Sequence, residues 1–460
     1  MKKPSKTPPK LSKNIWTEIK FFASFFDRFG EKSSLHGFKY IFSSKLNIFE
    51  RLMWLILFIL TSYAAYSISS TQYERYVANP TVISLERDYR EWNGTLPAIT
   101  ICYHKRIDDK RAKEVIKKLW NLSETDDDFQ YFYDFIKTIV YLNESFKDIN
   151  QFTNDRRLDD IDLLGLARDV HPIFNSVVSS FDSSAEFKLN EVITEKGICY
   201  TVNSVLWPLM STGKVNHNSI NLNAKPLSCY FLKNQCYMKL DVYDPTIFIA
   251  LHSPFEVPAE NTPFFDIGVT DEIEASYNML ETVASDELRK LRIAQRKCYF
   301  IDESSDNLPV YSFNACKMMC RAKTALRLCG CKPYFYPFLN GTTCTALGHL
   351  CLNVNHWPIV ASCDCSKTCV EIVYTQNSLK KINWAVDGGV PFASKSSFRY
   401  EIIAPRMRLK RDVLFSYEDL IVSFGGVAAL FLGLNFWGLS DFAFYLFASF
   451  VKYLIFKFKK

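Results

Sequence analysis

The apolar stretch FGGVAALFLGLNFWGLSDF, from Phe424 to Phe442, carries residue types that an apolar run rarely contains. They include four glycines, an asparagine at Asn435 and a carboxylate at Asp441. An ionised carboxylate facing lipid costs about 3 kcal/mol or more, so Asp441 is expected to face water or a partner group. A backbone break at Gly433-Leu434-Asn435 would expose carbonyl oxygens, which are suitable ligands for small cations. The predicted chemistry is cation passage through a carbonyl constriction followed by an acid.

The small residues Gly425, Ala429 and Gly433 are spaced four apart. On a helix this spacing gives a stripe that lets transmembrane helices approach closely, and ordinary packing of a helix pair remains an alternative use for it. At ~100° per residue, Asp441 would lie roughly 80° away from Gly433 on a continuous helix. The acid and the stripe would therefore face different directions unless the helix breaks between them.

Two apolar runs are the elements that would position these residues. Leu52–Ser69 carries no charge and has about the length that crosses ~30 Å of hydrocarbon as a helix. A buried core helix is the alternative for this run. The second run, from Leu420 to about Phe456, is interrupted only by Asp441 and Lys452 and is longer than one straight helix needs.

Charge is concentrated at the two ends of the chain. Residues 1–51 hold eleven Lys/Arg and four Asp/Glu, a net charge of +7, and the tail 452–460 holds four Lys and no acid. Since the whole chain carries +6, the middle is acidic, and this distribution disfavours nucleic acid as a partner. By the positive-inside tendency both ends lie in the cytoplasm, and the tail is also suited to anionic lipid.

The middle of the chain is predicted to be an extracellular, disulfide-rich α+β domain. All fourteen cysteines lie between Cys102 and Cys369, and the same block holds four sequons, at Asn93, Asn121, Asn143 and Asn340. The CGC and CDC pairs could ligate zinc, but an even cysteine count in an extracellular block favours bridges, so no metal is expected. Apolar periodicity predicts helices over 109–120 and 126–142, strands over 196–202, 237–242, 247–251 and 398–408, and mixed loop and strand over 270–284.

The resulting architecture is a membrane protein with two transmembrane helices, the second one broken, around an α+β ectodomain. Its expected parts are a cytoplasmic segment (1–51), a first span (52–69), an extracellular domain (70–417), a second span with the pore (418–451) and a cytoplasmic tail (452–460). No H-E-x-x-H, G-x-S-x-G or P-loop motif occurs, so an enzyme is not expected.

The sequence resembles the epithelial sodium channel/degenerin family, and within it the arthropod pickpocket branch. The resemblance rests on an ordered series of segments: SSLHGFKYIF before the first span, LPAITIC after it, GICYTVN, QRKCYFIDE, a cysteine series ending in CDCSKTC, and PRMRLKRDVLFSYEDLIVSFGG at the second span. This resemblance implies a trimer and a nested set of bridges. The implied pairs are Cys102–Cys199, Cys229–Cys236, Cys298–Cys369, Cys316–Cys365, Cys320–Cys363, Cys329–Cys351 and Cys331–Cys344.

The resemblance also assigns pore residues. The family breaks its pore helix at a Gly-x-Ser selectivity filter, which falls on Gly433, Leu434 and Asn435, with the following acid at Asp441. Asn in place of Ser, and a bulky Leu in the middle, depart from the family pattern and put the preference for sodium over potassium in doubt. Ala429 matches the region of amiloride block.

Gating residues follow by the same resemblance. His36-Gly37 match the cytoplasmic gating dipeptide, and Val422 falls on the degenerin position, where valine suggests raised resting activity. Arg296-Lys297 replace the tryptophan that couples ectodomain and first span in some relatives, so proton gating is not supported. Tyr73 and Tyr76 are candidates for the membrane-side contact, with an interfacial aromatic belt as the equal alternative.

The sequence therefore predicts a plasma-membrane subunit of a trimeric, voltage-insensitive, amiloride-sensitive sodium or cation channel that opens to an extracellular stimulus. It would assemble as a homotrimer or with related subunits, and it would need no cofactor beyond the permeant Na⁺ or another monovalent cation. The alternatives are a non-conducting modulatory subunit and a two-span receptor without a pore. The expected stimulus is chemical or mechanical, and an extracellular ligand of unassigned chemistry is a further expected partner.

Overall fold

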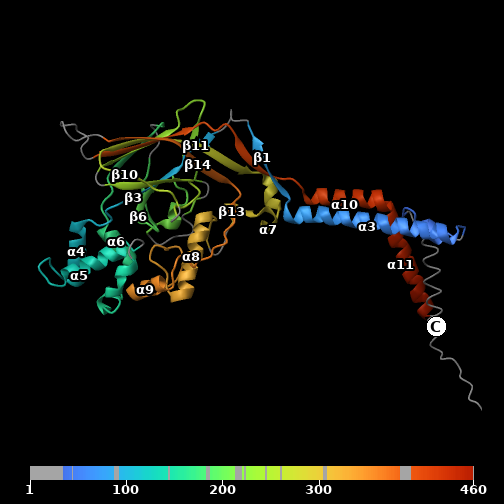
Figure 1. The fold of residues 1–460 in the computed structure, drawn as a ribbon, viewed down its shortest axis with the longest axis horizontal. Helices are drawn as coiled ribbons and strands as arrows, with labels where there is room; N and C mark the ends of the chain where they lie inside the picture. Colours follow the sequence, from blue (N-terminus) through green and yellow to red (C-terminus); the bar gives the residue numbers. More distant parts are fainter. Residues whose placement is uncertain are drawn as a thin grey trace, which may run out of the picture. The chain divides into compact units, whose positions relative to one another are not determined.

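The computed structural model describes residues 35–458 apart from 44, 88–92, 143–145, 183–186, 213–219, 222–223, 244–245, 260–261, 304–307 and 384–394. Asn143, most of the cytoplasmic segment and the last two lysines therefore lie outside the described residues. The chain divides into two compact units, one formed by residues 1–82 and 413–460 and the other by residues 83–412. Figure 1 shows the elements of both.

The first unit is helical and contains α2 (Phe38–Phe42), α3 (Ile48–Ala78), α10 (Tyr417–Leu432) and α11 (Phe436–Phe458). Within the described residues, α3 alone is long and apolar enough to cross a membrane by itself. The α10 helix and the first part of α11 pass the same test only when they are counted together as one bent pair. The α10 helix packs along α3, while many apolar side chains of α3, such as Leu60 and Tyr63, remain exposed.

The second unit is built on a seven-stranded mixed sheet with the order β1-β16-β11-β15-β8-β4, in which β14 also pairs with β11. The central β11 strand is parallel to β15 and β16 and antiparallel to β14. The bounds of these strands are β1 (Thr81–Glu86), β4 (Ser176–Ser180), β8 (Tyr237–Tyr243), β11 (Asp271–Ala284), β14 (Glu371–Asn383), β15 (Lys395–Ile403) and β16 (Arg408–Val413).

A second sheet has five antiparallel strands in the order β10-β9-β3-β6-β5. Two small sheets, β2-β7 and the parallel pair β12-β13, complete the strands. The bounds are β2 (Asn93–Thr95), β3 (Ala98–Tyr103), β5 (Asn190–Thr194), β6 (Gly197–Val202), β7 (Ser228–Tyr230), β9 (Ile247–His252), β10 (Phe265–Ile267), β12 (Cys298–Tyr299) and β13 (Lys367–Thr368).

The helices of the second unit are α4 (Asp109–Trp120), α5 (Phe129–Val140), α6 (Leu163–Val170), α7 (Ile293–Arg296), α8 (Phe313–Cys329) and α9 (Ala346–Val354). Short 3₁₀ segments occur at Phe146–Phe152, Arg156–Leu158, Trp207–Met210 and Asp286–Lys290. The α4 helix shows how the sequence sets these bounds. The Asp108 side chain caps it by accepting hydrogen bonds from the Lys110 and Arg111 N–H groups, and Asn121 ends it in the left-handed conformation.

Two hydrophobic cores hold the second unit together. One lies between the inner faces of the two large sheets, where β8 contributes Met238, Leu240 and Val242 because alternate residues of a strand share one face. The other joins α4, α5 and α6 to α8 and α9 and includes the fully buried Phe132. These cores make the strands and helices of the second unit a packed scaffold.

The expected helices over 109–120 and 126–142 are confirmed as α4 and α5, and three of the expected strands as β6, β8 and β9. The prediction of mixed loop and strand over 270–284 was wrong in part, because β11 is one continuous strand from Asp271. The single strand predicted over 398–408 was also wrong. It is two strands, β15 and β16, and the break between them contains Pro405, which has no N–H for a sheet ladder.

Seven disulfides are formed within the second unit, and they are the same pairs that the family resemblance implied. Cys316 and Cys320 lie one turn apart on α8, so this helix is tied twice to the segment before β13. Cys298–Cys369 joins β12 to the residue after β13. The bridges therefore fix α8 and the β12-β13 pair to each other.

Candidate functional site

The second long helix breaks at the residues where the sequence predicted a break. The α10 helix starts at a capping box between Ser416 and Asp419 and ends at Leu432, and α11 begins at Phe436. Gly433 stops α10 because its φ of 65° lies in the left-handed region, which glycine adopts without a steric cost. The pair formed by α10 and the first part of α11 is bent by 79°.

Asn435 starts the second half of this broken helix. Its side-chain oxygen accepts a hydrogen bond of 2.6 Å from the Gly438 N–H, and its carbonyl accepts one of 3.0 Å from the Leu439 N–H. This is the geometry of an N-cap residue, a position that favours Asn and Ser alike. The Asn that departs from the family pattern is therefore chemically conservative as a helix cap.

The expected gating dipeptide lies directly against the break. The His36 N–H donates a 2.9 Å hydrogen bond to the Leu432 carbonyl, and the His36 ring lies so close to Gly433 that a Cβ there would be 2.5 Å from it. Gly37 is also left-handed, with φ of 75°, and a Cβ there would be 3.0 Å from Trp54. The structure thus brings together two sets of residues from opposite ends of the sequence.

The break presents polar backbone within an otherwise apolar helix pair. The Gly433 and Leu434 N–H groups fold back to the Ala429 and Ala428 carbonyls, at 3.0 and 3.2 Å. The last carbonyls of a helix lack intrahelical partners and carry its partial negative charge. Such a helix end can stabilise a cation, and the His36 hydrogen bond holds one of these carbonyls in place.

The other predicted pore residues are exposed in the single chain. Gly425, Ala429 and Asp441 are exposed, and a Cβ at Gly425 would meet nothing within 4 Å. Asp441 has no polar side-chain partner among the described residues of the chain. Val422 is 73% exposed on α10. The small-residue stripe is thus not used to pack α10 against α3 at Gly425.

The two tyrosines near the end of α3 differ in their contacts. The Tyr76 ring lies 6.4 Å from the Tyr417 ring at the start of α10, and the neighbouring Arg75 guanidinium lies 5.5 Å from the Phe415 ring. Tyr73 is 54% exposed. Tyr76 therefore joins the ends of α3 and α10, whereas a contact for Tyr73 remains a prediction.

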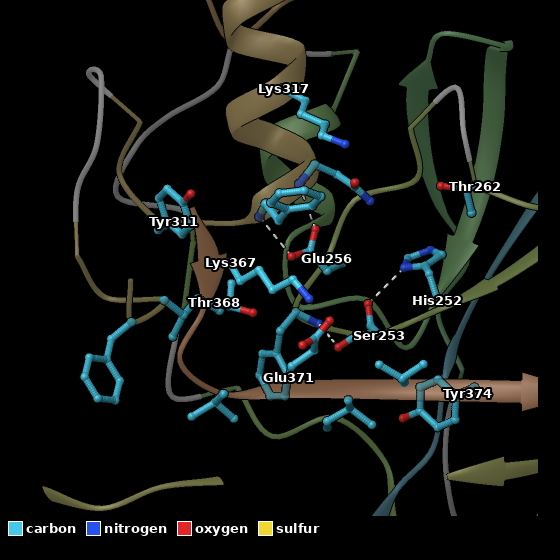
Figure 2. A pocket seen from close by; sticks show the side chains of 18 of the residues that line it. His252, Ser253, Glu256, Thr262, Tyr311, Lys317, Lys367, Thr368, Glu371 and Tyr374 are labelled. Atoms are coloured by element: carbon cyan, nitrogen blue, oxygen red, sulfur yellow. Dashed lines mark hydrogen bonds between the residues drawn. The ribbon is translucent and has the colours of Figure 1, made fainter. Parts of the chain in front are cut away.

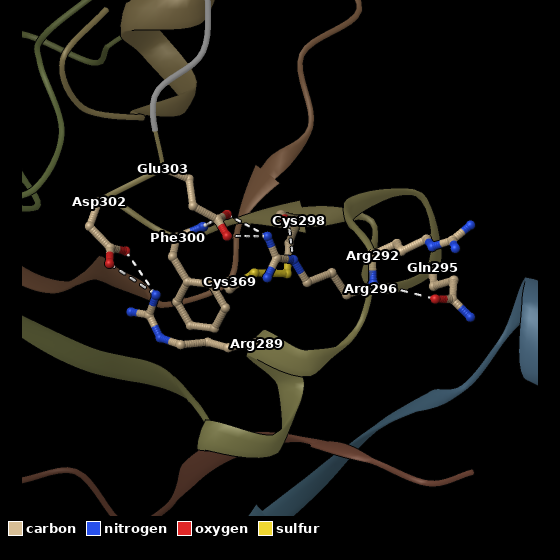
Figure 3. A network of polar contacts seen from close by, with 9 residues as sticks. All are labelled: Arg289, Arg292, Gln295, Arg296, Cys298, Phe300, Asp302, Glu303 and Cys369. Atoms are coloured by element: carbon tan, nitrogen blue, oxygen red, sulfur yellow. Dashed lines mark hydrogen bonds and ion pairs between the residues drawn. A yellow bond between two sulfur atoms is a disulfide. The ribbon is translucent and has the colours of Figure 1, made fainter. Parts of the chain in front are cut away.

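Arg296, which replaces the coupling tryptophan of some relatives, points into the second unit (Figure 3). It is 3% exposed, pairs with Glu303, and donates a 3.0 Å hydrogen bond to the Cys298 carbonyl. Its guanidinium and that of Arg289 lie 5.0 and 3.9 Å from the Phe300 ring. Arg296 therefore stabilises the region of the Cys298–Cys369 bridge and is not a surface contact.

The sequons that the structure describes are all accessible. Asn93 lies on β2, Asn121 follows α4 and Asn340 lies in the loop before α9, and each is exposed. Exposure is what a glycan requires, and the modification of these sites remains a prediction.

Comparison with known proteins decides the family. The family described as Amiloride-sensitive sodium channel (ASC) matches residues 29–445. The chain belongs to this family. It is therefore a membrane protein and a subunit of a cation channel of this family.

The relatives agree with the pickpocket branch that the sequence predicted. Sodium channel protein Nach of Drosophila melanogaster is 24% identical over 88% of this chain and 83% of that protein. Pickpocket protein 28 of the same species is 23% identical over 90% of this chain and 77% of that protein. A solved proton-activated chloride channel covers 88% of this chain and 96% of its own at 7% identity and a TM-score of 0.30.

Two features of the site were missed by sequence reasoning. The Asn435 cap could have been found, because Asn directly before an apolar helical run is an N-cap signal. The hydrogen bond from His36 to Leu432 has no local signal, since the two residues are far apart in the sequence and no periodicity relates them.

Proposed function

We propose that the chain is a pore-forming subunit of a trimeric, voltage-insensitive cation channel, in which the broken pair α10 and α11 is the second membrane span. The carbonyls and side chains at Gly433-Leu434-Asn435 form the constriction, and Asp441 is the acid beyond it. The main support is the helix break itself, with His36 bonded to Leu432 and Gly433 in the left-handed conformation.

The trimeric state and amiloride block are proposed on the exposed face of α10. Gly425 and Ala429 on α10 are exposed among the described residues, as is Asp441 on α11, and small residues suit close approach of helices from neighbouring copies. Ala429 lies on this same face, one turn before Gly433, where a cationic blocker would reach the helix end. We propose the plasma membrane as the location, with both termini cytoplasmic.

The side chain of Leu434 bears on selectivity and favours a second candidate function. A bulky residue stands where the family has a small one, so a homotrimer would bring three leucines toward one constriction. We propose sodium or another small monovalent cation as the permeant ion. A modulatory subunit that conducts only beside related subunits is the second candidate. The stimulus is proposed to be extracellular, acting on the bridged second unit.

The test is whole-cell current from cells that express this chain alone, with surface density measured in parallel. We expect an inward current that falls when external sodium is replaced by an impermeant cation and that amiloride reduces. Asp441→Ala should alter this current, whereas Asp441→Glu, which keeps the charge, should preserve it. A sodium current indifferent to both substitutions would refute the assignment of Asp441.

Absence of current despite surface expression would favour the modulatory subunit. Coexpression with a conducting relative then distinguishes a modulatory subunit from a receptor without a pore. A change in that relative's selectivity or block, lost with Asp441→Ala, would place this chain in a mixed pore. No change would favour a receptor without a pore.

A further inference from the structure

A cavity of about 600 Å³ lies between α8, β9, β13 and β14 (Figure 2). All of its lining residues belong to the second unit. The volume is in the range of sites for drug-sized ligands, and aromatic side chains form much of the wall, among them Phe300, Tyr311, Phe313 and Tyr374. The pore proposal makes no use of this cavity.

The buried polar groups of the cavity already have partners inside the protein. The Glu256 carboxylate caps α8 by accepting hydrogen bonds from the Ser312 hydroxyl (2.6 Å) and from the Phe313 and Asn314 N–H groups (2.9 and 3.1 Å). Burial raises the pKa of Glu256 above its usual value, and these hydrogen bonds oppose the shift. The N-terminus of α8 is thus occupied by the protein's own acid and does not call for an anionic ligand.

His252 supplies no charge to the cavity either. Its Nδ1 lies 2.9 Å from the Ser253 carbonyl oxygen and its Nε2 lies 2.8 Å from the Thr100 hydroxyl. Burial lowers the pKa of His252 to about 4, so the ring is neutral at physiological pH. Both ring nitrogens are engaged, and the residue acts as a structural part of the wall.

Two lysines of the wall are differently placed. The half-buried Lys317 has its ammonium 4.3 Å from the Phe313 ring centroid, and Lys367 is exposed and extends from β13 across the pocket in Figure 2. Neither forms an ion pair with a carboxylate among the described residues. By contrast, Arg289 is held by Asp302 at 3.0 and 3.1 Å. Glu371 is the acid of the wall that is not used as a helix cap.

We propose that this cavity binds an amphipathic organic anion, a molecule with one carboxylate or sulfonate on an aromatic or aliphatic body. Lys317 and Lys367 exceed Glu371 by one positive charge, which favours an anionic head, and the aromatic wall takes the apolar body. A cationic ligand would be repelled by two lysines and attracted by one carboxylate, so it is disfavoured.

The position of the cavity gives such a ligand a way to act. It would contact α8, which carries the Cys316 and Cys320 bridges, and β14, which pairs with the central strand β11. A ligand that touches both elements favours the arrangement in which both contacts are made. The proposed role is therefore a regulatory site on the second unit.

The test uses three probes that share one ring system and differ in charge: 2-naphthoate, 2-naphthylmethanol and 2-naphthylmethylammonium. Binding to the full chain in lipid nanodiscs is measured by equilibrium dialysis, with empty nanodiscs as the blank. We expect naphthoate to bind at least about tenfold more tightly than either other probe, because a partly buried charged contact contributes that much. Binding needs no current, so the result is independent of the pore proposal.

Substitutions place the site. Lys317→Met and Lys367→Met keep an unbranched side chain that is one heavy atom shorter and remove the charge, and each should raise the Kd for naphthoate by about three- to tenfold. Lys323→Met, on the exposed side of the same helix, is the matched control and should leave the Kd unchanged.

Three results would overturn the proposal: equal or tighter binding of the ammonium probe, no binding above empty nanodiscs, or a Kd that neither lysine substitution changes. If a variant fails to fold, the ranking of the three probes on the native chain still decides.

Discussion

Replacing Gly433 by alanine is the most direct perturbation of the helix break. Two costs add in the structure. An L-residue in the left-handed conformation is disfavoured by about 1–2 kcal/mol, and Gly433 has φ of 65°. The new methyl group would also stand 2.5–2.9 Å from three atoms of the His36 ring, and overpacking of this kind typically costs about 1–3 kcal/mol. The sum is about 2–5 kcal/mol, a shift of at least about thirtyfold towards other arrangements.

The assay is sodium current divided by surface density, with Gly426→Ala as the matched control. A Cβ at Gly426 meets nothing within 4 Å, and alanine suits a helix interior, so this control should retain current. His36→Ala keeps the backbone N–H that bonds Leu432 and removes the clashing ring. The double variant His36→Ala/Gly433→Ala should therefore recover part of the sodium current that Gly433→Ala alone loses. A double-mutant cycle measures this coupling between the two positions.

Equal currents from Gly433→Ala and Gly426→Ala would show that the left-handed backbone at Gly433 is not required. Purely additive effects of His36→Ala and Gly433→Ala would show that the steric contact between the two residues contributes nothing.

Three further predictions concern other parts of the chain. Val422→Ala should lower resting current, since a smaller residue at this exposed position favours closure; an unchanged or larger resting current contradicts this. Replacing both cysteines of Cys102–Cys199, a bridge with a sequence separation of 97, by serine should lower the free energy of unfolding by about 5 kcal/mol. The same change at Cys229–Cys236, with a separation of 7, should lower it by about 2 kcal/mol. Unfolding midpoints measure both effects, and equal shifts would count against loop entropy as the cause. Burial lowers the folded-state pKa of His252 to about 4, so the unfolded state binds a proton at a higher pH than the folded state does, and the free energy of unfolding should fall by about 2 kcal/mol between pH 7 and 5. His252→Gln should flatten this pH dependence in thermal unfolding. An unchanged pH dependence in the variant would exclude His252 as its source.

The sequence predicted local structure well where a cap and a periodic apolar face coincide. The α4 helix matched its predicted range because Asp108 and Asn121 mark its two ends. The strand predicted over 398–408 failed because alternation continues on both sides of Pro405, where the ladder is interrupted. β15 pairs with residues 272–278 of β11, and β16 pairs with residues 282–284 of the same strand. Alternation reports which face is buried and does not report where a ladder is interrupted.

The pore residues show the same limit. Gly425, Ala429 and Gly433 form one series in the sequence, yet the first two are helical and the last ends the helix. Which glycine stops a helix depends on tertiary contacts, here with His36, that no local pattern contains. The bridges could be paired only through the family resemblance, because spacing alone permits many connectivities for fourteen cysteines.

The hydrogen bond between His36 and Leu432 also bears on the order of synthesis. His36 precedes the ectodomain in the sequence and Leu432 follows it, and all seven bridges lie between them. In the proposed topology, the ribosome must finish the ectodomain before the partner of His36 exists. Disulfide formation and glycosylation of the ectodomain can then be complete in a chain whose pore segment has not yet been made. Mature bridges and glycans on a truncated or newly made chain would therefore not establish an assembled filter.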